Sequence, residues 1–261
     1  MSIALTPYLS GSLCHGHTWV VPDLVDLADQ LASVALGQSF HVERILAGTG
    51  IRPVATSTNA AKSGIQLLTA DTDPWHRDGW MFQVMSWIAA HAAAPAGLIR
   101  GPQMIHADKG FDGLKLEVDQ SSGIVTAAVI FEDKATENPR STIRDEVWAT
   151  FESLEGGAQE NVLTAEVATL LANQKKIDAD LAIQNIIWKT ARHYRIAVTV
   201  SDTHASEEGR AKLFKGYDTI AKGQIQRRRA ETFHVKELRK WMQALADTAI
   251  DRIHAKVTVS V

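Results

Sequence analysis

The spacing of hydrophobic positions predicts helices in the first third of this 261-residue chain. Residues 23–36 repeat apolar side chains at helical intervals directly after Pro22, and proline is favoured at helix starts. Residues 57–63 are polar and predict a loop. Residues 78–93 are apolar almost all round, with Gln83 among the few polar positions, which indicates a helix buried on most sides.

The pattern then changes to the two-residue alternation of a β-strand. Residues 114–118 alternate apolar and charged side chains, and residues 119–123 have the composition of a turn. Residues 124–131 form an apolar run rich in β-branched side chains. These features predict a β-hairpin whose second strand is buried more deeply than its first. Residues 98–105 are a candidate for a further strand before the hairpin.

The rest of the chain is predicted to be mostly helical, with one strong strand at residues 195–201. The predicted helices cover residues 141–154, 165–171, 180–194, 207–222 and 235–253.

We expect one α/β domain over residues 1–261, because the alternation of helices and strands is typical of that class. An extension of helix and loop would occupy residues 1–75, and the core would occupy residues 76–205. A basic helical extension would follow at residues 206–261. Helices would thus be added at both ends of the core.

The composition is that of an ordinary globular protein, with 45% hydrophobic and 22% charged residues. A single cysteine excludes a disulfide framework within the chain and zinc modules that need several cysteines. No apolar run approaches the roughly 20 residues of a membrane-spanning helix, and the N-terminus lacks a secretion signal. We therefore expect a cytoplasmic protein with no membrane association.

The formal net charge of −3 conceals an asymmetry along the chain. Residues 1–172 carry 10 basic and 20 acidic residues, whereas residues 173–261 carry 17 basic and 10 acidic residues. The densest basic segment is Arg227, Arg228 and Arg229, with Lys236 nearby. This segment has two interpretations: it grips a nucleic-acid backbone, or it is a solvated surface.

The residues that carry chemistry surround the predicted hairpin. Asp112 stands where the first strand begins, and Glu132 and Lys134 end the second strand on one face. Folding the hairpin brings all three together. The two carboxylates are hard oxygen ligands for Mg²⁺, and the backbone carbonyl of Asp133 is placed to add a third ligand. Lys134 could then orient a water molecule for attack on phosphorus.

The same residues have a simpler interpretation, in which Lys134 forms an ion pair that caps the hairpin. Arg140 and Arg144 follow Lys134 along the chain and also have two interpretations. They hold substrate phosphates, or they pair with nearby carboxylates. Near the N-terminus, Cys14, His15 and His17 either bind zinc or copper with a further ligand or lie in a loop as incidental residues.

At Asp112 and Glu132-Asp133-Lys134 the sequence resembles the PD-(D/E)XK nuclease superfamily, which has the restriction-endonuclease-like fold. The resemblance covers residues 78–200 and implies an αβββαβ core. It also implies an Mg²⁺-dependent endonuclease, with Mn²⁺ as a substitute, acting on DNA or on RNA. Phe111 stands where the family commonly has proline. Members often add a Glu or Gln from the first helix, so Gln83 is either that residue or a core amide.

The compact core with added helices also resembles the small nuclease subunits of bacterial antiphage defence systems, such as those of Hachiman type. No motor motif is present, so any helicase or ATPase would be a separate chain. A double-strand cut would require a homodimer. The alternative function is a non-catalytic module that binds nucleic acid or protein through a nuclease-like core.

Overall fold

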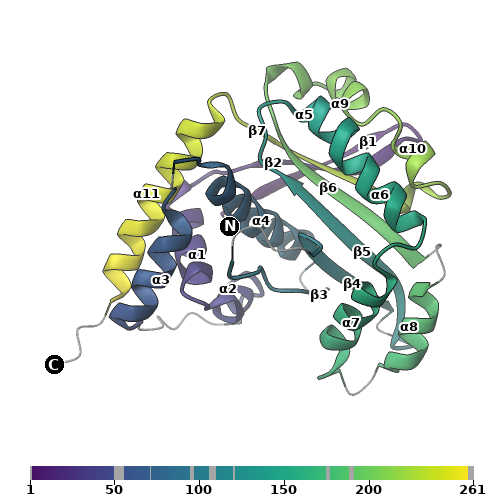
Figure 1. Ribbon diagram of the computed structural model, residues 1–261, viewed down its shortest axis with the longest axis horizontal. Coiled ribbons are helices and arrows are strands. Elements are labelled where there is room, and N and C mark those ends of the chain that lie inside the picture. The colour runs from purple at the N-terminus through teal and green to yellow at the C-terminus, as the bar shows by residue number, and fades with distance from the viewer. Residues whose placement is uncertain are drawn as a thin grey trace.

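The fold is a mixed α/β arrangement around a curled seven-stranded sheet (Figure 1). The computed structural model describes residues 2–49, 56–70, 72–94, 97–105, 110–119, 121–174, 177–187 and 191–257. In sheet order, the strands are β1 (Ala4–Ser10), β2 (Cys14–Val20), β7 (Arg228–His234), β6 (Arg192–Val200), β5 (Ile124–Lys134), β4 (Gly113–Asp119) and β3 (Leu98–Ile99).

The centre of the sheet is parallel and its two edges are antiparallel. Strands β2, β7, β6 and β5 run in the same direction. The β1–β2 hairpin forms one edge, and β5, β4 and β3 form an antiparallel series at the other. Parallel neighbours require long crossover connections, and helices supply them here.

The helices in the described part of the chain cover both faces of the sheet. They are α1 (Leu24–Ala35), α2 (Ser39–Leu46), α3 (Thr58–Leu68), α4 (Trp75–Ala93), α5 (Pro139–Thr142), α6 (Trp148–Glu155), α7 (Glu160–Leu171), α8 (Ala179–Ile187), α9 (Glu207–Leu213), α10 (Tyr217–Ile220) and α11 (Leu238–Lys256). A π-helical turn, Ile143–Val147, joins α5 to α6.

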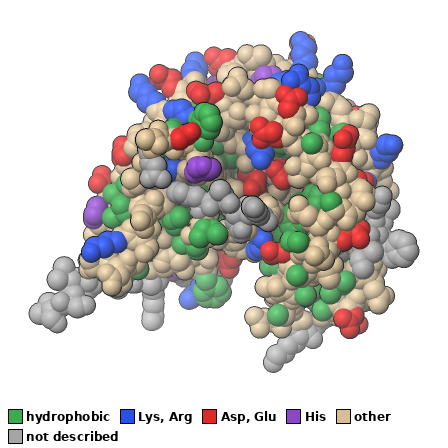
Figure 2. Space-filling model, viewed as in Figure 1, with side chains coloured by type: hydrophobic (Ala, Val, Ile, Leu, Met, Phe, Trp, Pro, Cys, Tyr) green, Lys and Arg blue, Asp and Glu red, His purple; other side chains and the backbone are tan. Residues whose placement is uncertain are grey.

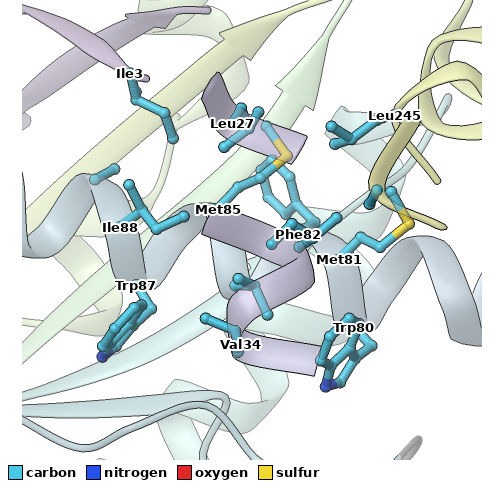
Figure 3. Packing of buried hydrophobic residues seen from close by; sticks show 14 of the residues in the cluster. Ile3, Leu27, Val34, Trp80, Met81, Phe82, Met85, Trp87, Ile88 and Leu245 are labelled. Atoms are coloured by element: carbon cyan, nitrogen blue, oxygen red, sulfur yellow. The ribbon is translucent and has the colours of Figure 1, made fainter. Parts of the chain in front are cut away.

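Each face of the sheet has its own hydrophobic core. On one face, α1, α4 and α11 pack together, and Figure 3 shows Phe82 and Met85 of α4 packed with Leu27 and Leu245 from the other two helices. The second core lies between the opposite face and α6, α7 and α10. The sheet therefore separates two layers of helices, as expected for this class.

Helix α4 confirms the prediction of a deeply buried helix at residues 78–93. Trp80, Met81, Val84, Met85 and Ile88 are all almost inaccessible to solvent. Burial on most sides fixes the position of the helix, and therefore of its few polar side chains, against the sheet.

Several other predicted elements are confirmed. The helix at 23–36 is α1, capped by Asp23, and the hairpin at 114–131 is the β4–β5 pair. The strand at 195–201 is β6, which begins three residues earlier. The helix at 141–154 is present as the continuous series from α5 to α6.

Other predictions were wrong. Residues 57–63 are not a loop, because Ser57 caps α3 by accepting a hydrogen bond from the backbone N–H of Ala60. The N-terminal extension contains strands β1 and β2, and the C-terminal extension contains strand β7. The candidate strand at 98–105 shrinks to the two residues of β3.

Two helices were predicted too long. The helix expected at 180–194 is described as α8 up to Ile187, and residue 192 already belongs to β6. The helix expected at 207–222 is divided into α9 and α10, with Gly216 in the left-handed conformation between them.

In the described part of the chain, no helix has the length and apolar character needed to cross a bilayer.

Candidate active site

The β4–β5 hairpin places Asp112 beside the end of β5. Gly113 pairs with Phe131, so the residue before β4 lies next to Glu132 and Asp133. A Cβ atom on Gly113 would lie 2.6 Å from the Phe131 ring, so glycine leaves the space that this ring occupies over the start of β4. Figure 1 shows this end of β5 lying close to α4 and α5.

The Asp112 carboxylate is held by two hydrogen bonds. Its Oδ1 accepts a hydrogen bond of 2.6 Å from the side-chain amide of Gln83 on α4. Its Oδ2 accepts one of 2.7 Å from the backbone N–H of Asp133. The half-buried side chain is therefore fixed by one group from the helix and one from the neighbouring strand.

Glu132 and Lys134 form an ion pair next to Asp112. Lys134 Nζ lies 3.1 Å from Glu132 Oε2. The Glu132 residue is only 7% exposed, whereas Lys134 is partly open to solvent. The structure thus contains the ion pair of the simpler sequence interpretation and also the convergence of Asp112, Glu132 and Lys134.

Asp133 points its side chain to the opposite face of the sheet, as alternation along β5 requires. Its Oδ1 accepts a hydrogen bond of 2.6 Å from the Ser86 hydroxyl, and Arg195 Nη1 lies 3.8 Å away. The Asp133 side chain is therefore anchored away from Glu132. The role predicted for its backbone carbonyl stays a prediction.

Burial raises the pKa values of the carboxyl groups at this site. Burial raises the pKa of Glu132 to about 7, with a further contribution from nearby Asp112, against the opposing effect of Lys134. Burial also raises the pKa of Asp112. The pKa of Asp133 is raised by burial to about 8, although Arg195 opposes the shift.

Lys134 shifts in the direction that keeps its charge. Burial acts to lower the pKa of Lys134, but the charges of Glu132 and Asp112 outweigh burial and raise it. Lys134 therefore stays positively charged beside the carboxyl groups of Glu132 and Asp112.

The donor set fits a hard divalent cation. Asp112 and Glu132 present carboxylate oxygens close enough to oppose each other's ionisation, and a cation between them would relieve that repulsion. Within the described residues, no group of three or more His, Cys, Asp or Glu side chains is arranged to hold a metal. Two carboxylates suit Mg²⁺, which usually keeps several water ligands and takes few from the protein.

A cavity of about 790 Å³ lies directly over these residues. Gln83, Asp112 and Lys134 line it, together with Trp75 and Trp80 from the start of α4. The volume is within the range of small-molecule and nucleotide sites. Further lining carboxylates come from the loop and π-helical turn after β5, namely Glu137, Asp145 and Glu146.

The two arginines after the triplet already have partners in the protein. Arg144 donates two hydrogen bonds, of 2.6 and 2.7 Å, to the carboxylate of Asp145. Arg140 donates to the backbone carbonyls of Leu213 and Lys215. For Arg144, the structure has the carboxylate pairing that the sequence left open as one of two interpretations.

The three consecutive arginines do not form an exposed basic patch. Arg227 and Arg228 are 7% and 4% exposed, and both donate mainly to backbone carbonyls inside the protein. Arg229 forms a two-point ion pair with Glu117, with distances of 2.7 and 2.9 Å. The structure corrects both interpretations of this segment, because these side chains point into the protein around β7.

Lys236 and Arg144 are the exposed residues among the predicted nucleic-acid contacts, and only Lys236 lacks a close carboxylate partner. Its side chain is 75% exposed, and its Nζ lies 3.9 Å from an oxygen of Asp202. Figure 2 shows acidic and basic side chains mixed over this face of the molecule, with no large area of a single sign.

The N-terminal Cys and His residues do not converge. They lie on β2, where alternation sends Cys14 into the second core and His15 and His17 to the other face. Cys14 is fully buried. The structure thus separates Cys14 from the two histidines, which share the other face, although all three lie on a strand and not in the loop that was the alternative.

Sequence reasoning missed Ser86 and Arg195, which both contact the carboxylate of Asp133. Arg195 Nη1 donates to Ser86 Oγ at 2.6 Å, and its guanidinium stacks 4.6 Å from the centre of the Phe131 ring. An arginine within the strand predicted at 195–201 was the available signal, because a buried cation requires partners.

Comparison of the chain with models of known protein families, with curated proteins and with solved structures found no match in any of the three. The interpretation of the site therefore depends on its geometry and on the sequence motif.

Proposed function

We propose that the protein is a metal-dependent nuclease that hydrolyses phosphodiester bonds, with DNA as its substrate. The observation that carries the proposal is the convergence of Asp112, Glu132 and Lys134, with Gln83 bound to Asp112 and with Asp112 and Lys134 lining one cavity. The order of helix α4, strands β3, β4 and β5, the helices α5 to α8 and strand β6 is similar to the αβββαβ order that the resemblance implies, with additional helices before β6, and this supports the proposal.

In this proposal Asp112 and Glu132 hold Mg²⁺ or Mn²⁺ with the backbone carbonyl of Asp133. The cation would neutralise charge on the phosphate and polarise it toward attack. The protein's own groups do the positioning. Gln83 and the Asp133 N–H fix both oxygens of Asp112, which leaves that carboxylate one defined orientation.

Lys134 has the position of a water-orienting group. Its ammonium lies at the partly open edge of the site, beside Glu132 and facing the cavity. There it would hold the attacking water and stabilise negative charge on the phosphate. The water oxygen bonds to phosphorus, and the bond to the leaving oxygen breaks. One proton leaves the water, and one proton reaches the leaving oxygen.

An exposed tryptophan in the cavity supports a nucleic acid as the substrate. Trp75 lines the cavity and is 66% exposed, which is unusual for tryptophan. Exposed aromatic rings stack on nucleic-acid bases, in RNA as well as DNA. The resemblance adds a role in bacterial antiphage defence, in the cytoplasm, with any helicase or ATPase on a separate chain.

The test is cleavage of supercoiled plasmid by the wild-type protein and by Glu132→Gln, with Mg²⁺ or Mn²⁺ and with EDTA as the metal-free control. We expect nicking or linearisation that requires metal and is lost in Glu132→Gln. Glu137→Gln is a matched control, because Glu137 is an exposed carboxylate on the same cavity wall and should cut normally. Full cleavage by Glu132→Gln would refute the proposed site.

Metal binding gives a second readout that does not depend on activity. Titration calorimetry with Mg²⁺ should show binding to the wild-type protein and much weaker binding to Asp112→Asn. Equal Mg²⁺ affinity in both proteins would show that Asp112 is not a ligand.

A further inference from the structure

A second cavity, of about 230 Å³, lies on the opposite face of the sheet from Glu132 and Lys134. Phe131 lines it, and alternation along β5 turns Glu132 to the other side. Its helix side is formed by Ala90, Ala93 and Ala94 at the C-terminal end of α4. These small side chains leave space that larger ones would fill.

The sheet side of this cavity is lined by charged or ionisable groups from β2, β7, β6 and β4. Lys115, Arg195 and Glu231 are only 8%, 4% and 5% exposed. Burying so much charge is costly unless every group is paired. The charged and ionisable lining residues are Lys115, Glu117, Arg195, Arg229, Glu231, His15 and His17.

The two carboxylates of the lining are already satisfied. Glu117 is bound by Arg229 and, at 3.0 Å, by Lys115. Glu231 accepts a 2.7 Å hydrogen bond from Trp19 and lies 3.5 Å from Arg195. Among the described lining residues, the three basic side chains of Lys115, Arg195 and Arg229 therefore face two carboxylates. Asp133 approaches Arg195 as well, but it does not line this cavity.

Two buried nitrogens of the lining have no hydrogen-bond partner. They are His15 Nε2 and Arg229 Nε. The histidines around Arg229 also respond to its charge. Burial and Arg229 lower the pKa of His15, and the same two causes lower the pKa of His193 to about 4. An anion in the cavity would offset the excess positive charge and accept hydrogen bonds.

We propose that this cavity binds a phosphate group, either as inorganic phosphate or as the terminal phosphate of a nucleotide. A phosphate has several acceptor oxygens and a negative charge that suit the guanidinium and ammonium groups present. The cavity is smaller than the usual range for whole drug-sized ligands, so it fits the phosphate end of a nucleotide and not the entire molecule. The proposal is independent of the nuclease activity.

The test is titration calorimetry of the full chain with inorganic phosphate and, separately, with deoxyadenosine 5′-monophosphate. We expect saturable binding to the wild-type protein. Arg229→Gln should weaken it by about tenfold or more, because it removes a cation from the lining. Arg252→Gln is the matched control, since Arg252 pairs with Asp29 on a different surface and should leave affinity unchanged.

Because Arg229→Gln also breaks the ion pair with Glu117, a second variant tests the site without removing charge. Ala93→Leu adds volume at an exposed position of α4 beside the cavity and should also weaken binding by about tenfold. Circular dichroism checks that both variants are folded.

The outcomes separate the two phosphate sources. Tighter binding of the nucleotide than of phosphate supports a nucleotide end, whereas equal or weaker binding supports free phosphate. Absence of saturable binding of both ligands to the wild-type protein would overturn the proposal. Unchanged affinity in a folded Ala93→Leu protein would overturn it as well.

Discussion

Gln83 connects the buried helix α4 to the carboxylate of Asp112. It is half-buried, and its amide donates a 2.6 Å hydrogen bond to Oδ1. Groups that orient a metal-binding carboxylate typically contribute about 10- to 100-fold to activity. Under the proposed nuclease function, we expect Gln83→Ala to lower kcat for plasmid cleavage by about that factor, with little change in KM or in the unfolding midpoint.

The control for this prediction is Gln66→Ala, because Gln66 is an exposed amide on α3. It should change neither kcat nor stability. If Gln83→Ala instead destabilised the fold and left kcat intact, Gln83 would be the core amide that the sequence allowed.

Gly16 lies where β2 passes extremely close to β7. A Cβ atom at this position would lie 1.7 Å from the backbone oxygen of Ala230, which cannot move without breaking the sheet. We expect Gly16→Ala to lower the free energy of unfolding by about 3 kcal/mol or more, measured by urea denaturation. In Gly79→Ala, by contrast, the added methyl meets no atom within 4 Å, so stability should be kept or slightly increased.

At the residue scale, the sequence predicted the proximity of Asp112, Glu132 and Lys134 well and the surroundings of the arginines poorly. Asp112, Glu132 and Lys134 could be placed together because one hairpin, with a readable turn, determines their proximity. The environment of Arg228 depends on carbonyls from Ser12 and Leu13, more than 200 residues away. Local sequence contains no signal for such distant partners.

Helix α1 begins with a capping aspartate, Asp23, whose hydrogen bonds allow its contribution to stability to be predicted. Asp23 Oδ1 accepts hydrogen bonds from the backbone N–H groups of Val25 and Asp26, at 2.8 and 3.2 Å. We expect Asp23→Ala to destabilise the protein by about 1 kcal/mol in urea denaturation. Asp23→Asn should retain most of that stability, because asparagine caps helices equally well. Equal loss in both variants would contradict a capping role.

At the scale of elements, the helices with clear apolar stripes and the local hairpin were predictable. Strands β1, β2 and β7 were not. β7 contains Arg228, Arg229 and Glu231. Arg228 donates to backbone carbonyls of loops, and Arg229 and Glu231 pair with charged groups on other strands. β2 contains two histidines and a glycine, so its apolar alternation is weak. In both strands, tertiary contacts override local propensity.

At the scale of the whole molecule, two histidines reduce stability in acid. Burial, with a contribution from Lys115, lowers the pKa of His91 to about 4, and burial with Arg229 lowers that of His193 to about 4. Both have an ordinary value of 6.5 when unfolded. Between these values each histidine binds more protons in the unfolded chain than in the folded one, so its contribution to stability falls as the pH falls.

The two histidines together are expected to cost of the order of 2 kcal/mol between about pH 7 and about pH 5, allowing for solvent screening. Glu132 and Asp133 act in the opposite direction over this range, because their raised pKa values make the folded chain bind more protons than the unfolded one. Urea denaturation of the wild-type protein and of the double variant His91→Gln, His193→Gln at the two pH values isolates the histidine contribution. On going from pH 7 to pH 5, the change in the free energy of unfolding should be more favourable in the double variant by about 2 kcal/mol. The same change in both proteins would mean that these histidines do not contribute.

The pairing of β2 with β7 joins segments about 200 residues apart, and α1 packs on α11 over a similar separation. During synthesis on the ribosome, β2 and α1 are made early. Their partners, β7 and α11, are made only when almost the entire chain is complete. Until then their apolar faces are open to chaperones and to other nascent chains. Closing such long loops also slows folding, so completion of the sheet is expected to be among the last steps in making an active molecule.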